Sequence, residues 1–277
     1  MIKKHNYDTE FGMVSMTTGS DIEKRGHIIG FKEEISKSAQ LSDDAFFTWF
    51  NKSKDKDTSF VRGYWDFVFH ILSPSWKYIS TPESKIALEI GYGGGRLLSA
   101  ASRFFSSVIG VDIHDNSELV SKELFERGIN NFKLLTSDGA SIQLGDDKID
   151  FVYSFIVLQH VERYEILVSY MRDVHRILKS GGVAVLYFGR KTYFPNNQNS
   201  SFFVFLDKFC ESIFISRGYR EIPARVNETN LVVTLVHIKN VAKQLGFDVV
   251  ADMVSRKKVP DGIRTFGGQH GLVLIKR

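Results

Sequence analysis

The sequence predicts an α/β protein built on a mainly parallel sheet with helices on both faces. Short, mostly apolar runs at residues 86–90 and 107–112 read as strands, and an amphipathic helical stretch follows each of them. Runs that are apolar almost throughout are typical of inner parallel strands covered on both sides. Five further strands are predicted along the chain, with the sequences NFKLLTSDGA, IDFVYSFIVLQHV, VAVLYFG, DVVADMVSR and HGLVLIKR.

The composition of the 277-residue chain excludes several classes of protein. No apolar stretch approaches the roughly 20 residues that span a bilayer, and the first residues lack the apolar core of a signal peptide, so we expect a cytoplasmic protein without a membrane span. The net charge is only +4 and the basic residues are dispersed, so nucleic acid is an unlikely partner. Cys210 is the only cysteine, which leaves no thiolate metal cluster, and we expect no metal.

A glycine-rich loop follows the first predicted strand and predicts a cofactor site. Four glycines lie within residues 91–95, and a helical pattern begins at Arg96. Such a loop lets a ligand approach bare backbone while the amide groups of the next helix point at it.

A nicotinamide-dependent enzyme is the first alternative to test, because two of these glycines begin the G-x-G-x-x-G fingerprint. Arg96 occupies the position of the third glycine, where close packing of helix on strand requires glycine or alanine. Glu89, two residues before the loop, is unfavourable beside a pyrophosphate but suits a ligand with an ammonium and a sulfonium group. This ligand is S-adenosylmethionine.

The segment Glu89-Ile90-Gly91-Tyr92-Gly93-Gly94-Gly95 resembles the first motif of the class I S-adenosylmethionine-dependent methyltransferases, an acidic residue followed by G-x-G-x-G. The resemblance is to the small-molecule type 11 group, and its motifs cover roughly residues 80–190. It implies a Rossmann-like, seven-stranded sheet whose last strand is antiparallel, with S-adenosylmethionine as cofactor and S-adenosylhomocysteine as product. Within this motif it implies a cofactor-binding role for Glu89, Gly91, Tyr92, Gly93 and Gly95.

The ends of the next two strands carry further cofactor-binding residues. Asp112 follows the loop by about twenty residues, the spacing of a carboxylate that holds ribose hydroxyls, and Ile113 lies beside it. Asp138 and Gly139 match the position where the family places its contacts with the adenine. The alternatives are structural: Asp112 as a helix cap, and Asp138-Gly139 as a plain turn.

The sequence at the end of the fourth strand indicates which kind of methyltransferase the chain resembles. The resemblance implies that residues 154–160 face the methionine part of the cofactor and the acceptor, and that Ser154 binds the cofactor. The segment lacks the D/N-P-P-Y/F motif of the enzymes that methylate exocyclic amines of DNA bases. The chain also lacks the Pro-Cys nucleophile of cytosine carbon methylation and the Asp-Asn magnesium ligands of the catechol type. The broad small-molecule group remains.

His160 is the candidate catalytic residue. It lies just past the fourth strand, at the edge where the glycine loop and Asp112 converge in a parallel sheet. A neutral imidazole there can take the proton of an acceptor hydroxyl. The alternative is a cap or hydrogen-bond anchor for the next helix. His270 is a reserve candidate, whereas His175 and His237 lie in predicted helices and are expected to be structural.

Two segments extend the minimal fold. Residues 1–80 form a predicted helical extension, in which Tyr64 and Trp65 either line the site or pack structurally. The methyltransferase domain occupies residues 81–277 and includes a cap or lid insertion at about 190–230. This insertion holds a phenylalanine-rich helix that either roofs the acceptor site, packs into the core or forms a homodimer seam.

We therefore expect methyl transfer to an oxygen or nitrogen of a small-molecule or glycan-type acceptor. The alternatives are a methyltransferase acting on nucleic acid or protein, a nicotinamide-dependent oxidoreductase, and a non-catalytic partner that keeps the fold.

Overall fold

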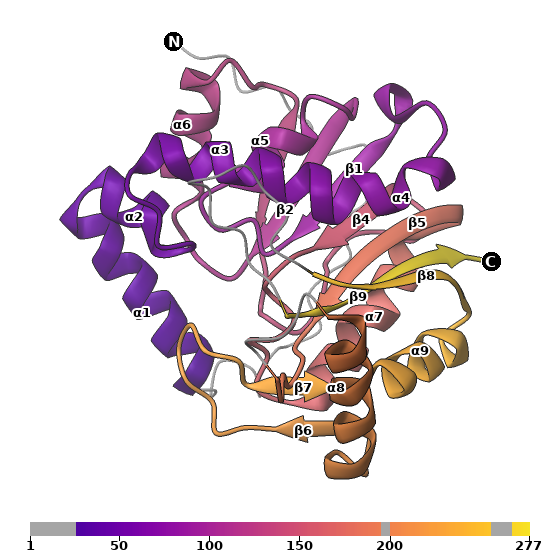
Figure 1. The fold of residues 1–277 in the computed structure, drawn as a ribbon. Helices are drawn as coiled ribbons and strands as arrows, with labels where there is room; N and C mark the ends of the chain where they lie inside the picture. Colours follow the sequence, from indigo (N-terminus) through magenta and orange to yellow (C-terminus); the bar gives the residue numbers. More distant parts are fainter. Residues whose placement is uncertain (1–25, 195–199, 256–267) are drawn as a thin grey trace.

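The computed structural model describes residues 26–194, 200–255 and 268–277. Its centre is a seven-stranded sheet in the order β3-β2-β1-β4-β5-β9-β8 (Figure 1). Neighbouring strands are parallel from β3 to β5, whereas the last strand, β9, is antiparallel to both of its neighbours. The predicted Rossmann-like sheet with an antiparallel last strand is confirmed.

The strands of this sheet are β1 (Ile86–Ile90), β2 (Ser107–Asp112), β3 (Phe132–Thr136), β4 (Ile149–Ser154), β5 (Leu178–Phe188), β8 (Phe247–Val254) and β9 (His270–Lys276). A separate antiparallel hairpin consists of β6 (Tyr219–Glu221) and β7 (Leu231–Val233). The helices that follow the strands are α5 (Arg96–Ala101), α6 (Ser117–Glu126), α7 (Tyr164–Ile177), α8 (Ser201–Phe214) and α9 (Leu235–Gln244).

The described part of the N-terminal extension is helical, as predicted. It consists of α1 (Gly26–Leu41), α2 (Asp43–Trp49), α3 (Lys56–Asp66), a π-helical turn (Phe67–Leu72), α4 (Ser73–Ser75) and two short 3₁₀ turns (Trp76–Tyr78 and Pro82–Ser84). The Ser42 and Asp55 side chains accept backbone amides at the starts of α2 and α3, which satisfies donors that a helix start leaves unpaired.

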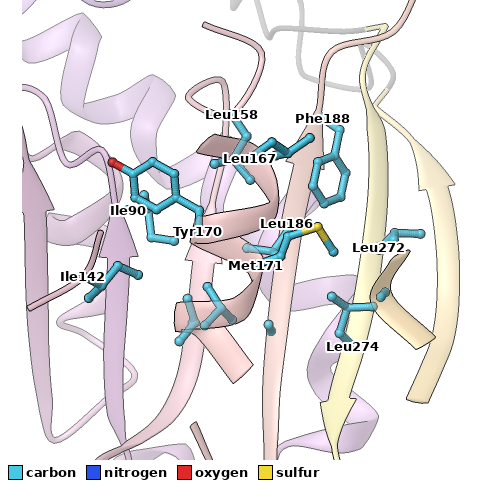
Figure 2. Packing of buried hydrophobic residues seen from close by; sticks show 14 of the residues in the cluster. Ile90, Ile142, Leu158, Leu167, Tyr170, Met171, Leu186, Phe188, Leu272 and Leu274 are labelled. Atoms are coloured by element: carbon cyan, nitrogen blue, oxygen red, sulfur yellow. The ribbon is translucent and has the colours of Figure 1, made fainter. Parts of the chain in front are cut away.

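The core lies on both faces of the sheet because β1 alternates its side chains. Leu88 and Ile90 belong to a cluster with α7 and α9, whereas Ala87 belongs to a second cluster with α5 and the N-terminal helices. Figure 2 shows the first cluster, where Tyr170 and Met171 of α7 lie over the sheet. Because both faces are covered, the open positions of the sheet are its edges and the ends of its strands.

The end of the inserted segment is attached beside β4. Asn230 is fully buried, and its side-chain amide donates to the carbonyl oxygens of His160 and Arg225, each at 3.0 Å. Its Oδ1 accepts the Arg225 amide at 2.8 Å. Asn230 thereby joins the segment around residues 225–230 to the chain that leaves β4.

Candidate active site

A pocket opens where the carboxyl ends of β1, β2 and β4 meet. It encloses about 1200 Å³ with its open mouth included, which suits a small-molecule site. Seven of the predicted cofactor residues line it: Glu89, Gly91, Tyr92, Gly93, Asp112, Ile113 and Gly139. The position agrees with the general rule that open parallel sheets bind ligands outside the carboxyl ends of their strands.

The loop after β1 requires glycine for two reasons. Gly91, Gly93 and Gly95 all have positive φ angles, between +51° and +78°, which side chains rarely adopt. A Cβ atom on Gly91 would lie 2.2 Å from Cγ2 of Val157, and one on Gly93 would lie 2.9 Å from the Phe50 ring. The loop therefore presents bare backbone to the pocket. Gly95 does not line the pocket; it begins α5 and packs against α6.

Asp112 ties the glycine loop to the end of β2. Its Oδ2 accepts the Gly93 amide and its Oδ1 accepts the Ile113 amide, both at 2.7 Å. The carboxylate lines the pocket and does not cap α6, which starts after Asn116. Each carboxylate oxygen keeps a second lone pair, so the predicted contact with two ribose hydroxyls is chemically available.

Glu89 is a buried carboxyl group at the base of the pocket. It is 3% exposed, and the Tyr153 hydroxyl donates to its Oε2 at 3.0 Å. Burial raises the pKa of Glu89 to about 8, against the opposing effects of that hydrogen bond and of the Arg96 charge. Arg96 itself is ion-paired with the fully buried Asp66, with 2.5 Å between Nη1 and Oδ2. Glu89 is therefore largely protonated at neutral pH and ionises when a cation comes close.

Tyr92 and His114 form the side of the glycine loop that faces β2. The buried Tyr92 hydroxyl has no hydrogen-bond partner, and burial raises its pKa. Its ring lies edge-on to the His114 ring, with centroids 4.9 Å apart. Nε2 of His114 donates to the Gly93 carbonyl at 3.0 Å while its Nδ1 accepts the Asn116 amide, which defines a neutral tautomer. Sequence reasoning missed His114, although it follows Asp112 by two residues.

The structure places two predicted cofactor residues behind the pocket wall. Both carboxylate oxygens of Asp138 accept hydrogen bonds within its own turn, from Ala140 and Ser141, while Ser137 and Gly139 line the pocket. The Ser154 hydroxyl is fully buried and donates to the Ile90 carbonyl at 3.2 Å, which links β4 to β1. The adenine and cofactor contacts of Asp138 and Ser154 stay predictions.

His160 lines the pocket as predicted, within a defined hydrogen-bond chain. Its Nδ1 donates to the Glu228 carbonyl at 2.6 Å, which leaves Nε2 as the acceptor of the neutral ring. The Gln159 amide lies 3.3 Å from Nε2, and Gln269 donates to the Gln159 carbonyl oxygen at 2.9 Å. The ring is therefore anchored to the inserted segment rather than to the next helix, and its tautomer is compatible with the predicted role as a base, which stays a prediction.

The three other histidines considered from the sequence, His175, His237 and His270, do not line the pocket. His270 is fully buried and its Nε2 lies 2.9 Å from both oxygens of Glu211, so the reserve role at this pocket was wrong. His175 packs edge-on against Phe247, and His237 is hydrogen-bonded to the Tyr164 hydroxyl. The expected structural roles of His175 and His237 agree with these contacts.

The N-terminal helices α1 and α2 form the outer wall of the pocket. They contribute a set of apolar side chains, Phe31, Ile35, Phe47, Trp49 and Phe50. The ring centroids of Phe31 and Trp49 are 6.1 Å apart, and those of Trp49 and Phe50 are 5.1 Å apart. Sequence reasoning missed these aromatics, although AFFTWF was recognisable as an amphipathic helix.

Tyr64 and Trp65 do not line this pocket, so the suggested site role was wrong and structural packing is what the structure shows. The Tyr64 hydroxyl lies 3.4 Å from the Ser99 carbonyl on α5, and Trp65 stacks on Phe69. The physical reason is that α3 packs its flank on α5, where a Cβ atom on Gly63 would lie 2.3 Å from the Arg96 carbonyl oxygen.

Comparison with known proteins agrees with this geometry. Residues 88–186 match the family model described as a methyltransferase domain. Phosphoethanolamine N-methyltransferase 2 of Caenorhabditis elegans is 23% identical over 216 residues, which cover 74% of this chain and 48% of that protein. The tRNA (carboxymethyluridine(34)-5-O)-methyltransferase of Saccharomyces cerevisiae is 31% identical over 109 residues, 38% of this chain and 36% of that protein. The chain thus spans about half or less of these curated relatives.

Solved structures show the same fold. A S-adenosylmethionine-dependent methyltransferase from Clostridium acetobutylicum has a TM-score of 0.54 at 14% identity, covering 87% of this chain and 98% of that one. A second, from Methanosarcina mazei, has a TM-score of 0.51 at 18% identity, covering 73% and 95%.

The sheet order and the glycine-loop pocket define a Rossmann-like nucleotide-binding enzyme. Residues 88–186 match the methyltransferase-domain model, and the fold is that of S-adenosylmethionine-dependent methyltransferases, which confirms the predicted resemblance to the class I enzymes. The pocket fits that cofactor: it offers bare backbone at the loop, carboxyl groups at Asp112 and Glu89, and an orphaned hydroxyl at Tyr92. Within the described ranges, no helix is long and apolar enough to cross a membrane, and no cluster of residues suited to a metal ion occurs.

Proposed function

We propose that this chain transfers a methyl group from S-adenosylmethionine to an oxygen or nitrogen of a small-molecule or glycan-type acceptor. The observation that carries the proposal is the composition of the pocket beyond the glycine loop. Aromatic rings from α1 and α2 lie on one side of it, and His160 and Glu162 also line it. An apolar pocket with few polar groups is typical of small-molecule recognition.

The charge of the pocket supports an acceptor without a phosphate backbone. Arg96 is the only lysine or arginine among the described residues that line it, and its guanidinium is ion-paired with Asp66. Proteins that bind nucleic acid need several cations at the contact. The similarity to a yeast tRNA methyltransferase keeps RNA as a second candidate, which the experiment below includes.

In the proposed reaction the cofactor, the aromatic wall and His160 each have a separate role. The bound cofactor supplies a methyl group on a positively charged sulfur. The aromatic wall orients the acceptor and excludes water, and such positioning can contribute roughly 7 to 11 kcal/mol to lowering the barrier. The Nε2 lone pair of His160 is the site that takes the acceptor proton, once the Gln159 amide turns away from it.

The test is release of S-adenosylhomocysteine from panels of phenols, sugars, amines and total tRNA. His160→Ala should lower turnover on the true acceptor by about 100-fold or more while leaving cofactor affinity nearly unchanged, because the proposed base is removed and the residues proposed to hold the cofactor are retained. His175→Gln, a histidine change on α7 away from the pocket, is the matched control and should retain full activity.

Two outcomes would contradict the proposal. Methylation confined to tRNA would replace the small-molecule acceptor with RNA. Wild-type turnover of His160→Ala between about pH 6 and pH 9 would leave the histidine with only its anchoring bond to Glu228.

A further inference from the structure

Helix α8 has its polar and apolar faces reversed relative to an ordinary surface helix. Its two acidic residues, Asp207 and Glu211, are at most 1% exposed. Its large apolar side chains are instead exposed by more than half, at 63% for Phe202, 63% for Phe205, 55% for Phe209, 54% for Ile213 and 66% for Phe214. Contiguous apolar surface of this kind marks an interaction site.

Buried ion pairs hold the helix in this orientation. Oδ2 of Asp207 lies 2.7 Å from Nη2 of Arg190, and its Oδ1 accepts the amides of Tyr193 and Phe194 at 2.8 and 3.0 Å. The Glu211 carboxylate contacts His270 at 2.9 Å. Rolling the phenylalanine face inward would leave buried charges without partners, which is strongly unfavourable. The exposed apolar face is therefore a fixed feature of the fold.

Exposed cations outnumber exposed acidic residues beside this face, where Glu221 at the end of β6 is the one exposed acidic residue between 191 and 221. The exposed charged residues between 191 and 220 are Lys191, Lys208, Arg217 and Arg220. The only acidic residues in that range are the two that α8 buries. Arg220 is close enough to Tyr193 to lower the pKa of its hydroxyl in opposition to burial, and the Tyr193 ring packs 5.6 Å from that of Phe214. The cations thus form a rim next to the aromatic side chains.

We propose that α8 is a membrane-surface element that lies on anionic lipid headgroups. A helix with aromatic side chains on one face and lysine and arginine at its border inserts its apolar face at the headgroup boundary, and each nearby cation strengthens binding to anionic lipid. The 14 residues of α8 span only about 21 Å, and the helix lies on the bilayer rather than across it. Figure 1 shows α8 beside the hairpin strands β6 and β7.

A second copy of the chain fits this face less well. In a two-fold dimer the same patch meets itself, so the basic rims would face each other. Because four exposed cations stand against one exposed acidic residue, Glu221, between 191 and 221, that contact would bring mostly like charges together.

Flotation of the full chain with vesicles tests the proposal. Vesicles of equal parts phosphatidylcholine and phosphatidylglycerol should carry the protein at low salt, whereas vesicles of phosphatidylcholine alone should carry about ten-fold less. Phe205→Glu with Phe209→Glu should abolish flotation, and Lys208→Glu with Arg217→Glu should weaken it about ten-fold. Val61→Glu with Phe125→Glu, which changes two exposed apolar residues on α3 and α6, should float like the wild type.

Circular dichroism melting of each variant separates loss of binding from loss of fold. The proposal is overturned if the folded wild type does not float with anionic vesicles at low salt, or if it floats equally with both vesicle types. It is also overturned if light scattering shows a dimer that the Phe205→Glu/Phe209→Glu variant dissociates, since the face would then belong to a second copy.

Discussion

At the scale of single residues, Glu89 shows how the fold changes the charge of a side chain. Its carboxyl group belongs to the motif that identifies the cofactor, yet burial raises its pKa to about 8 from 4.5. The Tyr153 hydroxyl and the Arg96 guanidinium only partly offset this effect. Burial thus favours the protonated form of a group that would be ionised in water at neutral pH, and a positively charged ligand beside it would favour ionisation.

This shift predicts the pH dependence of stability in the cofactor-free protein. The folded state holds the Glu89 proton up to about pH 8, whereas the unfolded chain releases it near pH 4.5, so the favourable contribution is complete below about 4.5 and is lost as the pH rises through about 8. Between about pH 6 and pH 9 the free energy of unfolding should therefore fall more steeply in wild type than in Glu89→Gln. Urea titrations at several pH values measure this, and parallel curves for the two proteins would mean that Glu89 does not titrate in this range.

Asp112 carries the predicted ribose contact. Asp112→Ala should weaken S-adenosylhomocysteine binding by about 1.5 to 3 kcal/mol, or ten-fold or more, because a charged acceptor of two hydroxyls is lost. Asp115→Ala is the matched control, since the Asp115 side chain is 76% exposed. Unchanged affinity in calorimetry of the folded Asp112→Ala variant would remove Asp112 from the ribose site.

At the scale of elements, the segment after β6 is the part of the insertion that reaches the site. Of residues 190–230, Asn227 lines the pocket and the Glu228 carbonyl holds His160, whereas no described residue of α8 lines it. We therefore assign the proposed influence on acceptor choice to residues 222–230 rather than to the phenylalanine-rich helix.

Asn230 anchors this segment, so its loss should affect turnover more than cofactor binding. Asn230→Ala leaves the His160 and Arg225 carbonyls without the amide that bonds them, and should cost about 1 to 3 kcal/mol of stability. Denaturant unfolding and steady-state kinetics measure the two effects, with Thr229→Ala as the neighbouring control. A cofactor affinity that falls as far as turnover does would contradict this division of roles.

Helix boundaries and faces show what sequence patterns can predict. The glycine run, the strand ends at Asp112 and the apolar face of α7 are local signals, and each lies where it was expected. The pattern of α8 also predicts two faces. It does not say which face is buried, because that depends on Arg190, which follows β5, and on His270, the first residue of β9, rather than on the helix itself. Helix α7 ends at Ile177 because β5 begins directly at Leu178.

At the scale of the whole molecule, the pocket joins parts of the chain that lie far apart in sequence. The Phe50 ring of the N-terminal extension meets the Gly93 backbone, and Val157 after β4 meets Gly91. The sheet edge was predictable, because parallel strands bring their carboxyl ends together. The aromatic cover was not, because its contact with the glycine loop depends on how α1 and α2 pack, and no local pattern encodes that packing.

The central claim is that this covered pocket binds S-adenosylmethionine and its product rather than a dinucleotide. Calorimetric titration of the full chain with S-adenosylhomocysteine, and separately with NAD, tests the claim most directly. We predict saturable binding of S-adenosylhomocysteine at one site per chain and no heat of binding with NAD, because the Glu89 carboxyl is unfavourable beside a pyrophosphate and Arg96 replaces the glycine or alanine of the dinucleotide fingerprint. Binding of NAD that S-adenosylhomocysteine does not displace, with no site for S-adenosylhomocysteine, would contradict the account.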